Sequence, residues 1–223
     1  MLERSVRQVL ARLAEDSLVL DVGGWAKPFA RADWVIDLMP YATRGMLGRD
    51  GEGEELFSVT TWIERDLCAR EPFPFPDDHF DFVVCSQTLE DLRDPVWVCS
   101  ELVRVGKAGY VEVPSRLEEQ TYGFQGPWVG WGHHRWLVDV TPGRIDFAFK
   151  HHVVHRDGSH FPAGFRDRLS EEERVQALWW EGGFEYGERI FVRPDDLDHY
   201  LADFVAEHLG PRAGADPAVG HAP

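Results

Sequence analysis

Carboxylates close several short apolar runs in the first third of the chain. Asp21 ends the run LVLD and is followed by Gly23 and Gly24, Asp37 ends the run WVID, and Asp66 closes a third run. In an open parallel sheet, ligands bind beyond the carboxyl ends of the strands, and a carboxylate there can accept hydrogen bonds from both hydroxyls of a ribose. The spacing therefore predicts a nucleoside site.

The turn after Asp21 lacks the features that bind a phosphate. It has no GxGxxG pattern and carries the bulky residues Trp25, Lys27 and Pro28. The interval to Asp37 leaves room for only about one to two helical turns, whereas a pyrophosphate site uses the N-terminus of a full helix. We therefore expect a nucleoside ligand without phosphates and not NAD or FAD.

A second group of reactive side chains lies in the segment GPWVGWGHHRW, residues 126–136. In a functional interpretation, Trp128, Trp131 and Trp136 form the walls of an apolar substrate pocket, and His133 or His134 accepts a proton from the substrate as catalytic base. In a structural interpretation, the same residues pack a hairpin on the sheet. The sequence leaves both interpretations open.

Six of the ten histidines lie close together in the sequence, at positions 133, 134, 151, 152, 155 and 160. Neutral imidazoles are ligands for zinc or iron. Adjacent residues on a strand point to opposite faces, however, so one member of each HH pair would be directed away from any shared site. We therefore predict no metal site.

The elements that must position these residues alternate between strands and helices. A helix is predicted in the first fifteen residues and another from Pro95 to about Gly106, and residues 40–58 are expected to form a mobile loop. Strands are predicted at 18–22, 32–38, 60–67, 82–85 and 109–114. This alternation indicates an α/β fold with a Rossmann-like, doubly wound and mostly parallel sheet.

The alternation stops after Pro114. We expect a single domain over residues 1–210, with a core at 1–114, a lid or substrate region at 115–168 that contains a hairpin, and a C-terminal helix-strand-helix unit at 169–209. Ser170 and Glu173 form a capping box, which predicts a helix from Ser170 to about Glu181. A last helix is predicted from Asp195 to about Leu209, and residues 210–223 are expected to be a disordered tail.

Composition limits the classes of partner. Asp and Glu total 39 against 23 Lys and Arg, a formal net charge of -16, and such a field repels nucleic acid and anionic lipid. No apolar run is long enough to span a bilayer, and the first residues do not resemble a signal peptide. Three cysteines without CxxC spacing predict reduced, buried thiols. These features predict a cytoplasmic protein with a small-molecule partner, and they leave the oligomeric state open.

From Leu18 to Pro114 the sequence resembles the class I S-adenosylmethionine-dependent methyltransferases, specifically the type 11 methyltransferase domain family. VLDVGG is similar to their glycine-rich first motif, WVID to their ribose-binding strand end, and RDLCAREPFPFPDDHFDFVVCSQTLEDLRDP to their adenine loop and fourth strand. The segment SELVRVGKAGYVEVP resembles the helix and strand that follow. The resemblance implies S-adenosylmethionine as cofactor, bound by Asp21, Gly23, Gly24, Asp37, Asp66, Leu67, Ser86 and Gln87.

The resemblance also implies roles for these residues. Gly23 and Gly24 would allow close approach of the methionine part, Asp37 would hold the ribose, and Ser86 would offer backbone atoms to the amino-acid end. The chain departs from the family at the third glycine and at Asp91, which stands where many relatives have histidine. We expect a methyltransferase that acts on an oxygen or nitrogen of a small molecule. The alternative is a catalytically silent binding or scaffold protein with this fold.

Overall fold

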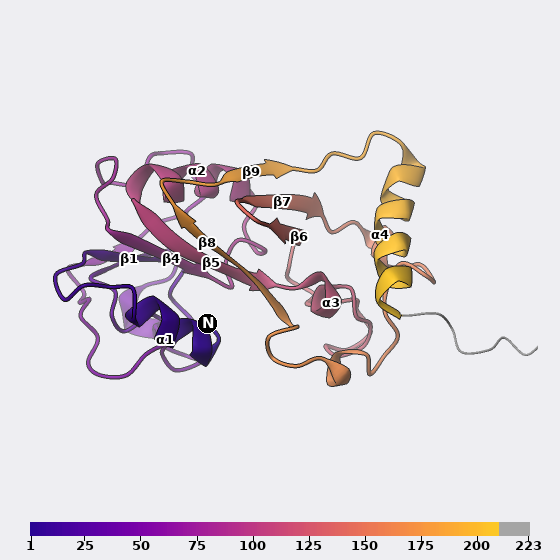
Figure 1. Cartoon of the computed structure of the whole chain (residues 1–223), viewed down its shortest axis with the longest axis horizontal. Coiled ribbons are helices and arrows are strands. Elements are labelled where there is room, and N and C mark those ends of the chain that lie inside the picture. Colours follow the sequence, from indigo (N-terminus) through magenta and orange to yellow (C-terminus); the bar gives the residue numbers. More distant parts are fainter. Residues whose placement is uncertain (210–223) are drawn as a thin grey trace, which may run out of the picture.

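A six-stranded, mostly parallel sheet forms the centre of the protein (Figure 1). The computed structural model describes residues 1–209, so the expected tail at 210–223 lies outside the described residues. The strand order is β3-β2-β1-β4-β5-β8, with β1 to β5 parallel and β8 antiparallel to β5. The strands are β1 (Val19–Val22), β2 (Trp34–Asp37), β3 (Trp62–Glu64), β4 (Phe82–Ser86), β5 (Ala108–Pro114) and β8 (Val175–Glu181).

The strand order reverses next to β1. The chain passes outward from β1 to β3 on one side and then returns to place β4 on the other side of β1. Ligands of such sheets bind at this point, beyond the carboxyl ends of the strands. The predicted Rossmann-like, mostly parallel α/β fold is confirmed.

Alternate residues of the strands supply two hydrophobic cores, one on each face of the sheet. Leu20 and Val22 pack in the core that includes helix α2 (Pro95–Val105), whereas Val19 packs on the other face with helix α1 (Glu3–Leu10). Side chains alternate across a strand, and a strand covered on both faces is therefore apolar at nearly every position. Burying each such side chain contributes about 1.5–3 kcal/mol.

Helix α2 begins where the sequence predicts. The Asp94 carboxylate accepts a hydrogen bond from the Trp97 N–H at 3.1 Å, and Pro95 occupies the first helical turn, where its missing N–H has no cost. Val98 and Leu102 lie on the buried face, and the helix ends before Gly106. Helix α2 therefore connects β4 to β5 as a parallel crossover.

A second sheet of three strands covers the α2 face (Figure 1). It contains the predicted hairpin, β6 (Trp136–Thr141) and β7 (Arg144–Phe149), with β9 (Glu185–Glu188) parallel to β7. Val138 and Phe147 of the hairpin pack into the same core as α2. The hairpin, expected as part of a lid or substrate region, therefore covers a face of the large sheet.

The helix predicted from Ser170 is wrong. The capping box does form, with Ser170 N–H to Glu173 at 2.8 Å and Glu173 N–H to Ser170 Oγ at 3.2 Å, but it stabilises only a turn. From Val175 onward the chain is β8, which forms seven residue pairs with β5. Pairing with the free edge of β5 outweighs the local helix signal, and Leu178 and Trp180 alternate into the core as a strand requires.

No helix forms between β1 and β2, where the interval leaves room for only about one to two helical turns. Residues 45–56 lie against residues 25–30 instead. Backbone hydrogen bonds join Gly45 to Trp25 at 2.8 Å, Leu47 to Ala26 at 2.9 Å, and Asp50 to Pro28 at 2.9 Å. The segment 40–58, which the sequence predicts to be a mobile loop, is thus attached along its length to the turn after β1.

The remaining helical elements lie mostly beyond β5. The short elements are η1 (Tyr41–Thr43), α3 (Arg116–Glu119), η2 (His152–His155) and η3 (Arg166–Arg168), and the last helix, α4 (Pro194–Leu209), matches its prediction. The segment with His151 and His155, predicted as strand, is in fact a 3₁₀ turn. In the part of the chain that the structure describes, no helix has the length and apolar character needed to cross a bilayer.

Candidate functional site

The turns after β1 and β4 touch at the point where the strand order reverses. Gly23 has a φ of +81°, and a Cβ there would lie 2.2 Å from Thr88 Oγ1. The Thr88 hydroxyl lies 3.3 Å from the Gly23 carbonyl oxygen and 3.1 Å from the Ser86 carbonyl oxygen. The glycine is therefore required by the close approach of the two turns, as well as by its backbone conformation.

Asp37 lies at the end of β2 beside this turn, where the sequence predicts a ribose-binding carboxylate. Both of its oxygens accept backbone hydrogen bonds, one from the Trp25 N–H at 3.0 Å and one from the Met39 N–H at 2.8 Å. Burial raises the pKa of Asp37, and these two N–H groups partly offset the effect. Asp37 thus fixes the loops on either side of it, and each carboxylate oxygen keeps acceptor capacity for a hydroxyl.

Asp21 is buried next to the same turn. Its Oδ2 atom accepts the Phe29 N–H at 2.8 Å, and a Cβ on Gly24 would lie 2.2 Å from that oxygen. Burial is the main cause that raises the pKa of Asp21 from 3.8 to about 7, with smaller contributions from the charges of Asp50 and Asp37. Asp21 and Asp37 therefore interact, as the sequence analysis expects of neighbouring strand ends.

Asp66 and Leu67 follow β3 at the edge of the sheet. Asp66 accepts the Cys68 N–H at 2.9 Å and forms an ion pair with Arg93, and Leu67 is buried in the α2 core. The Asp37 carbonyl accepts the Arg65 N–H at 2.7 Å, which joins the ends of β2 and β3. Asp66 and Leu67, which belong to the segment similar to the adenine loop, thus lie beside the β2 end, but the Asp66 side chain faces Arg93.

Ser86 and Gln87 end β4 and both contact Glu112 of β5. Their side chains lie 3.3 and 3.4 Å from Glu112 Oε1. Gln87 and Glu112 line a hollow of about 250 Å³ together with Met1, Pro114 and Arg174. Sequence reasoning missed Glu112, although a carboxylate within the buried run YVEVP is the kind of signal that marks a functional or paired group.

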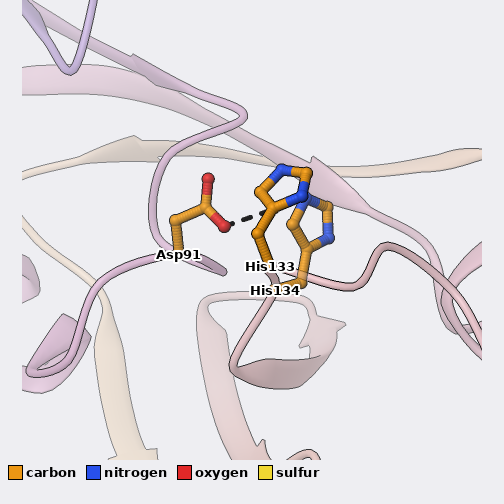
Figure 2. Close-up of side chains that lie close together, drawn as sticks. All are labelled: Asp91, His133 and His134. Carbon is orange, nitrogen blue, oxygen red and sulfur yellow. Dashed lines mark ion pairs between the residues drawn. The ribbon is translucent and has the colours of Figure 1, made fainter.

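Asp91, His133 and His134 form a cluster next to the β4 turn (Figure 2). One potential ligand atom from each side chain lies within 4.8 Å of the other two, and His134 Nε2 is 3.9 Å from Asp91 Oδ1. The Trp131 carbonyl accepts the His134 N–H at 3.3 Å, so the two histidines lie in a turn before β6. The expectation that adjacent histidines point apart assumed a strand, and it does not hold for this pair.

Glu119 of α3 holds His134 in place. Its Oε2 atom lies 2.8 Å from His134 Nδ1, and its Oε1 atom forms an ion pair with Lys150. The Trp131 N–H also donates to this carboxylate, at 3.2 Å. The Glu119 carboxylate favours a proton on Nδ1, so the lone pair of Nε2 faces Asp91. Neither Glu119 nor Lys150 was identified from the sequence.

The segment 88–92 links the cluster to the strand ends. The Glu90 carbonyl accepts the Arg135 N–H at 2.8 Å, and the Thr88 carbonyl accepts the Asp91 N–H at 3.1 Å. Burial raises the pKa of Glu90 well above its ordinary range, and it also raises the pKa of Asp91 against the opposing effect of His134. The turn with Thr88 against Gly23 therefore also carries the acidic side chain of the histidine cluster.

The three tryptophans predicted to wall a pocket are not brought together. Trp136 is buried, and its Nε1–H donates to the Leu92 carbonyl at 2.6 Å. Trp128 is 53% exposed and lies near His155. Trp131 packs beside both histidines of the cluster, with ring centroids 6.0 and 5.9 Å from those of His133 and His134. Only Trp131 is placed to contact a molecule bound at the cluster.

A larger hollow, of about 420 Å³, lies at the opposite end of the sheet. Arg12, Asp81, Phe82, Ala108 and Trp179 are among the residues that line it, near the amino ends of β4 and β5. Parallel α/β sheets bind ligands at the carboxyl ends of their strands. We therefore place the candidate site at the strand ends and not in this larger hollow.

Comparison with known proteins finds a likeness in the central part of the chain. Residues 34–111 match a family model described as a methyltransferase domain. This central part of the chain is therefore similar to a methyltransferase domain. The match begins at Trp34 and ends at Val111, so the glycine-rich segment at 18–24, which the sequence analysis included in the resemblance, lies outside it.

Solved methyltransferases resemble parts of the chain. A putative methyltransferase from Bacillus halodurans is 20% identical, with 51% of this chain and 51% of that chain covered and a TM-score of 0.37. A methyltransferase from Aquifex aeolicus is 21% identical, with 53% and 68% covered and a TM-score of 0.35. One from Mesorhizobium loti is 17% identical, with 66% and 62% covered and a TM-score of 0.37.

The chain covers about half the length of several of these solved relatives. No curated protein matches the sequence.

Proposed function

We propose that the protein transfers the methyl group of S-adenosylmethionine to an oxygen or nitrogen atom of a small molecule. One observation carries this proposal: the glycine turn of β1, Asp37 of β2 and the segment 86–88 after β4 lie together where the strand order reverses. S-adenosylmethionine is a nucleoside joined to an amino acid. Its site needs carboxylates that accept hydrogen bonds from the ribose hydroxyls, and exposed backbone groups that bind the amino-acid end.

The donor and acceptor chemistry of the strand ends fits this cofactor. Asp37 has acceptor capacity left on both oxygens for the ribose hydroxyls, and Asp66 and Leu67 lie beside it for the adenine. Gly23, Gly24, Ser86 and Gln87, with Asp21 behind them, are assigned to the methionine part. When bound, the cofactor supplies an electrophilic methyl group on a positively charged sulfur.

His134 is the residue best arranged to accept a proton from the methyl acceptor. Glu119 bonded to Nδ1 leaves the Nε2 lone pair free to act as a base, and it would stabilise the imidazolium that forms. His133 is exposed and lies beside it, so it is the second candidate base. The chain's own task is then to orient the acceptor and remove its proton, since methyl transfer itself is an in-line displacement.

Charge supports a small, neutral or cationic acceptor. The net charge is -16, and the carboxylates of Asp91 and Glu119 lie beside His134, the proposed base. A polyanion would meet repulsion both at a distance and at the site. The cytoplasmic location that we propose is supported by the three cysteines, Cys68, Cys85 and Cys99, which are free and buried.

Calorimetry and turnover test this function. S-adenosylmethionine should bind in titration calorimetry, and NADP should give no heat and no protection against thermal unfolding. With a panel of phenols and primary amines as acceptors, His134→Ala should lower the rate of S-adenosylhomocysteine release by about 10²- to 10⁴-fold and leave cofactor affinity unchanged. His152→Ala is the matched control, since it removes an imidazole outside the site. An equal loss in both variants would contradict the assignment of the base.

Two observations favour a second candidate, a silent member of the fold that binds a partner. Both Asp37 oxygens are engaged by the protein's own backbone, and the family match begins after the glycine turn. This candidate predicts no heat with S-adenosylmethionine even at millimolar concentration. Heat of binding together with measurable turnover would exclude it.

A further inference from the structure

The cluster of Asp91, His133 and His134 combines one carboxylate and two imidazoles. These are the ligand types that zinc and iron take from proteins, and three protein ligands with open positions are typical of metal sites that also bind water or a substrate. Asp91 ends the turn after β4, and both histidines come from the turn before β6. We propose that the three side chains bind a divalent transition-metal ion such as Zn²⁺.

The distances agree with a shared ion. Ligand atoms that each lie roughly 2 Å from one metal are separated from one another by roughly 3 to 3.5 Å. His134 Nε2 and Asp91 Oδ1 are 3.9 Å apart, and all three ligand atoms lie within 4.8 Å of one another. Small side-chain rotations close the remaining gap. In Figure 2 the Asp91 carboxylate points toward the two imidazole rings.

The Asp91 carboxylate gives independent support. Its Oδ1 atom is buried and has no hydrogen-bond partner. A buried carboxylate oxygen without a partner is costly in free energy, and native proteins satisfy such atoms with water, ions or protein donors. A cation between Asp91 and His134 would satisfy this oxygen at the place where the imidazole lone pair also points.

The surroundings of His134 match those of a metal-bound histidine. Such histidines usually donate their other ring N–H to a carboxylate, which fixes the ring and increases its basicity. Glu119 occupies this position, 2.8 Å from Nδ1, and is itself held by Lys150 and by the Trp131 N–H.

Metal binding does not depend on the proposed methyl transfer. A bound ion would take the Nε2 lone pair of His134, so this atom can act as the general base only in the metal-free protein. Because Zn²⁺ binding is measured on the protein alone, without S-adenosylmethionine, failure of the metal site and failure of the methyltransferase function give separate results.

The test is titration of the full, chelator-treated chain with ZnCl₂ against a chromogenic zinc indicator. We expect one equivalent of Zn²⁺ to bind, and we expect Asp91→Ala, His133→Ala and His134→Ala each to weaken binding by more than about 10-fold. Glu119→Gln should weaken it by about 10- to 100-fold while the three ligands remain. Zn²⁺ should raise the thermal unfolding temperature of the wild type but not that of Asp91→Ala.

His151 and His152 provide the matched control, because their rings are also adjacent, with centroids 3.9 Å apart, but lie outside the cluster. His151→Ala and His152→Ala should bind Zn²⁺ as the wild type does. The proposal is overturned if the wild type binds no Zn²⁺, or if the control variants lose as much affinity as the cluster variants. His133 is exposed, so a folded His133→Ala variant with unchanged affinity would also overturn it.

Discussion

The Thr88 hydroxyl lies 3.3 Å from the carbonyl oxygen of Gly23, and this contact joins the turn after β1 to the turn after β4. The same hydroxyl lies 3.1 Å from the Ser86 carbonyl oxygen, within its own turn. Thr88 therefore fixes the spacing of the two strand ends between which the cofactor of class I methyltransferases is expected to bind. The space that a side chain would need at Gly23 is filled by Thr88 itself.

Gly23→Ala should therefore destabilise the fold more than an ordinary glycine substitution. Gly48 is the control, since its φ of +90° resembles the +81° of Gly23 but nothing lies within 4 Å of a Cβ there. Gly48→Ala should cost about 1–2 kcal/mol from backbone strain. Gly23→Ala should cost about 1–3 kcal/mol more because of the clash with Thr88. Urea denaturation measures both losses, and equal losses would show that the contact is unimportant.

Asp37→Ala should weaken both cofactor binding and the fold. Loss of the hydrogen bonds to Trp25 and Met39 leaves two N–H groups unpaired, which costs about 1–3 kcal/mol of stability for each group that stays buried. Loss of the ribose contacts should raise the dissociation constant for S-adenosylmethionine by about 5- to 150-fold, equivalent to about 1–3 kcal/mol.

Asp81→Ala separates these two effects. Asp81 also accepts a backbone N–H, that of Leu18 at 2.9 Å, but it lies at the amino end of β4, away from the strand ends of the site. This variant should lose stability in chemical denaturation and keep full cofactor affinity in calorimetry. If a folded Asp37→Ala variant also keeps full affinity, Asp37 has only a structural role.

Asp21 should make stability depend on pH. Its pKa is about 7 in the folded protein and 3.8 ordinarily, so between about pH 4 and pH 7 the folded state keeps a proton that the unfolded state releases. Stability from this group is therefore full below about pH 4 and decreases as pH rises to about 7, by at most about 1.4 kcal/mol per pH unit. The Asp21→Asn variant should not show this decrease in stability, because the asparagine side chain does not ionise.

The test compares urea unfolding of the wild type and Asp21→Asn from pH 4.5 to 7.5. The variant should gain stability relative to the wild type as pH increases, since other titrating groups act equally on both proteins. A difference that stays constant with pH would mean that Asp21 ionises at its ordinary pKa and that its burial has no electrostatic cost.

The tryptophans should differ sharply in their contribution to stability. Trp136 is 8% exposed and donates to the Leu92 carbonyl, so Trp136→Ala should cost about 3–5 kcal/mol through the cavity and the lost hydrogen bond. Trp128 is 53% exposed, so Trp128→Ala should change stability by less than about 0.5 kcal/mol. Thermal unfolding checks both, and similar shifts would contradict the burial described.

Local patterns predicted the parallel strands and helix α2 correctly. Val19, Leu20 and Val22 form a continuous apolar run because β1 is covered on both faces, and Pro95 marks the helix start because its ring suits the first turn. The same reasoning failed at Val175–Glu181. The capping box at Ser170 forms, but the residues after it form a strand because they pair with the otherwise unpaired edge of β5.

The sequence by itself determined the strand ends of the sheet and the carboxylates and glycines that follow them, because burial on two faces requires apolar runs and polar residues end them. Only the tertiary structure decided that Asp91 meets His133 and His134, and that Glu119 orients the second of these. Such contacts depend on turns and on backbone hydrogen bonds between distant segments, such as that from Arg135 to Glu90. The periodicity of a sequence indicates which face of a helix or strand is buried, but not which distant residues pack against that face. Contacts of this kind therefore cannot be predicted from periodicity.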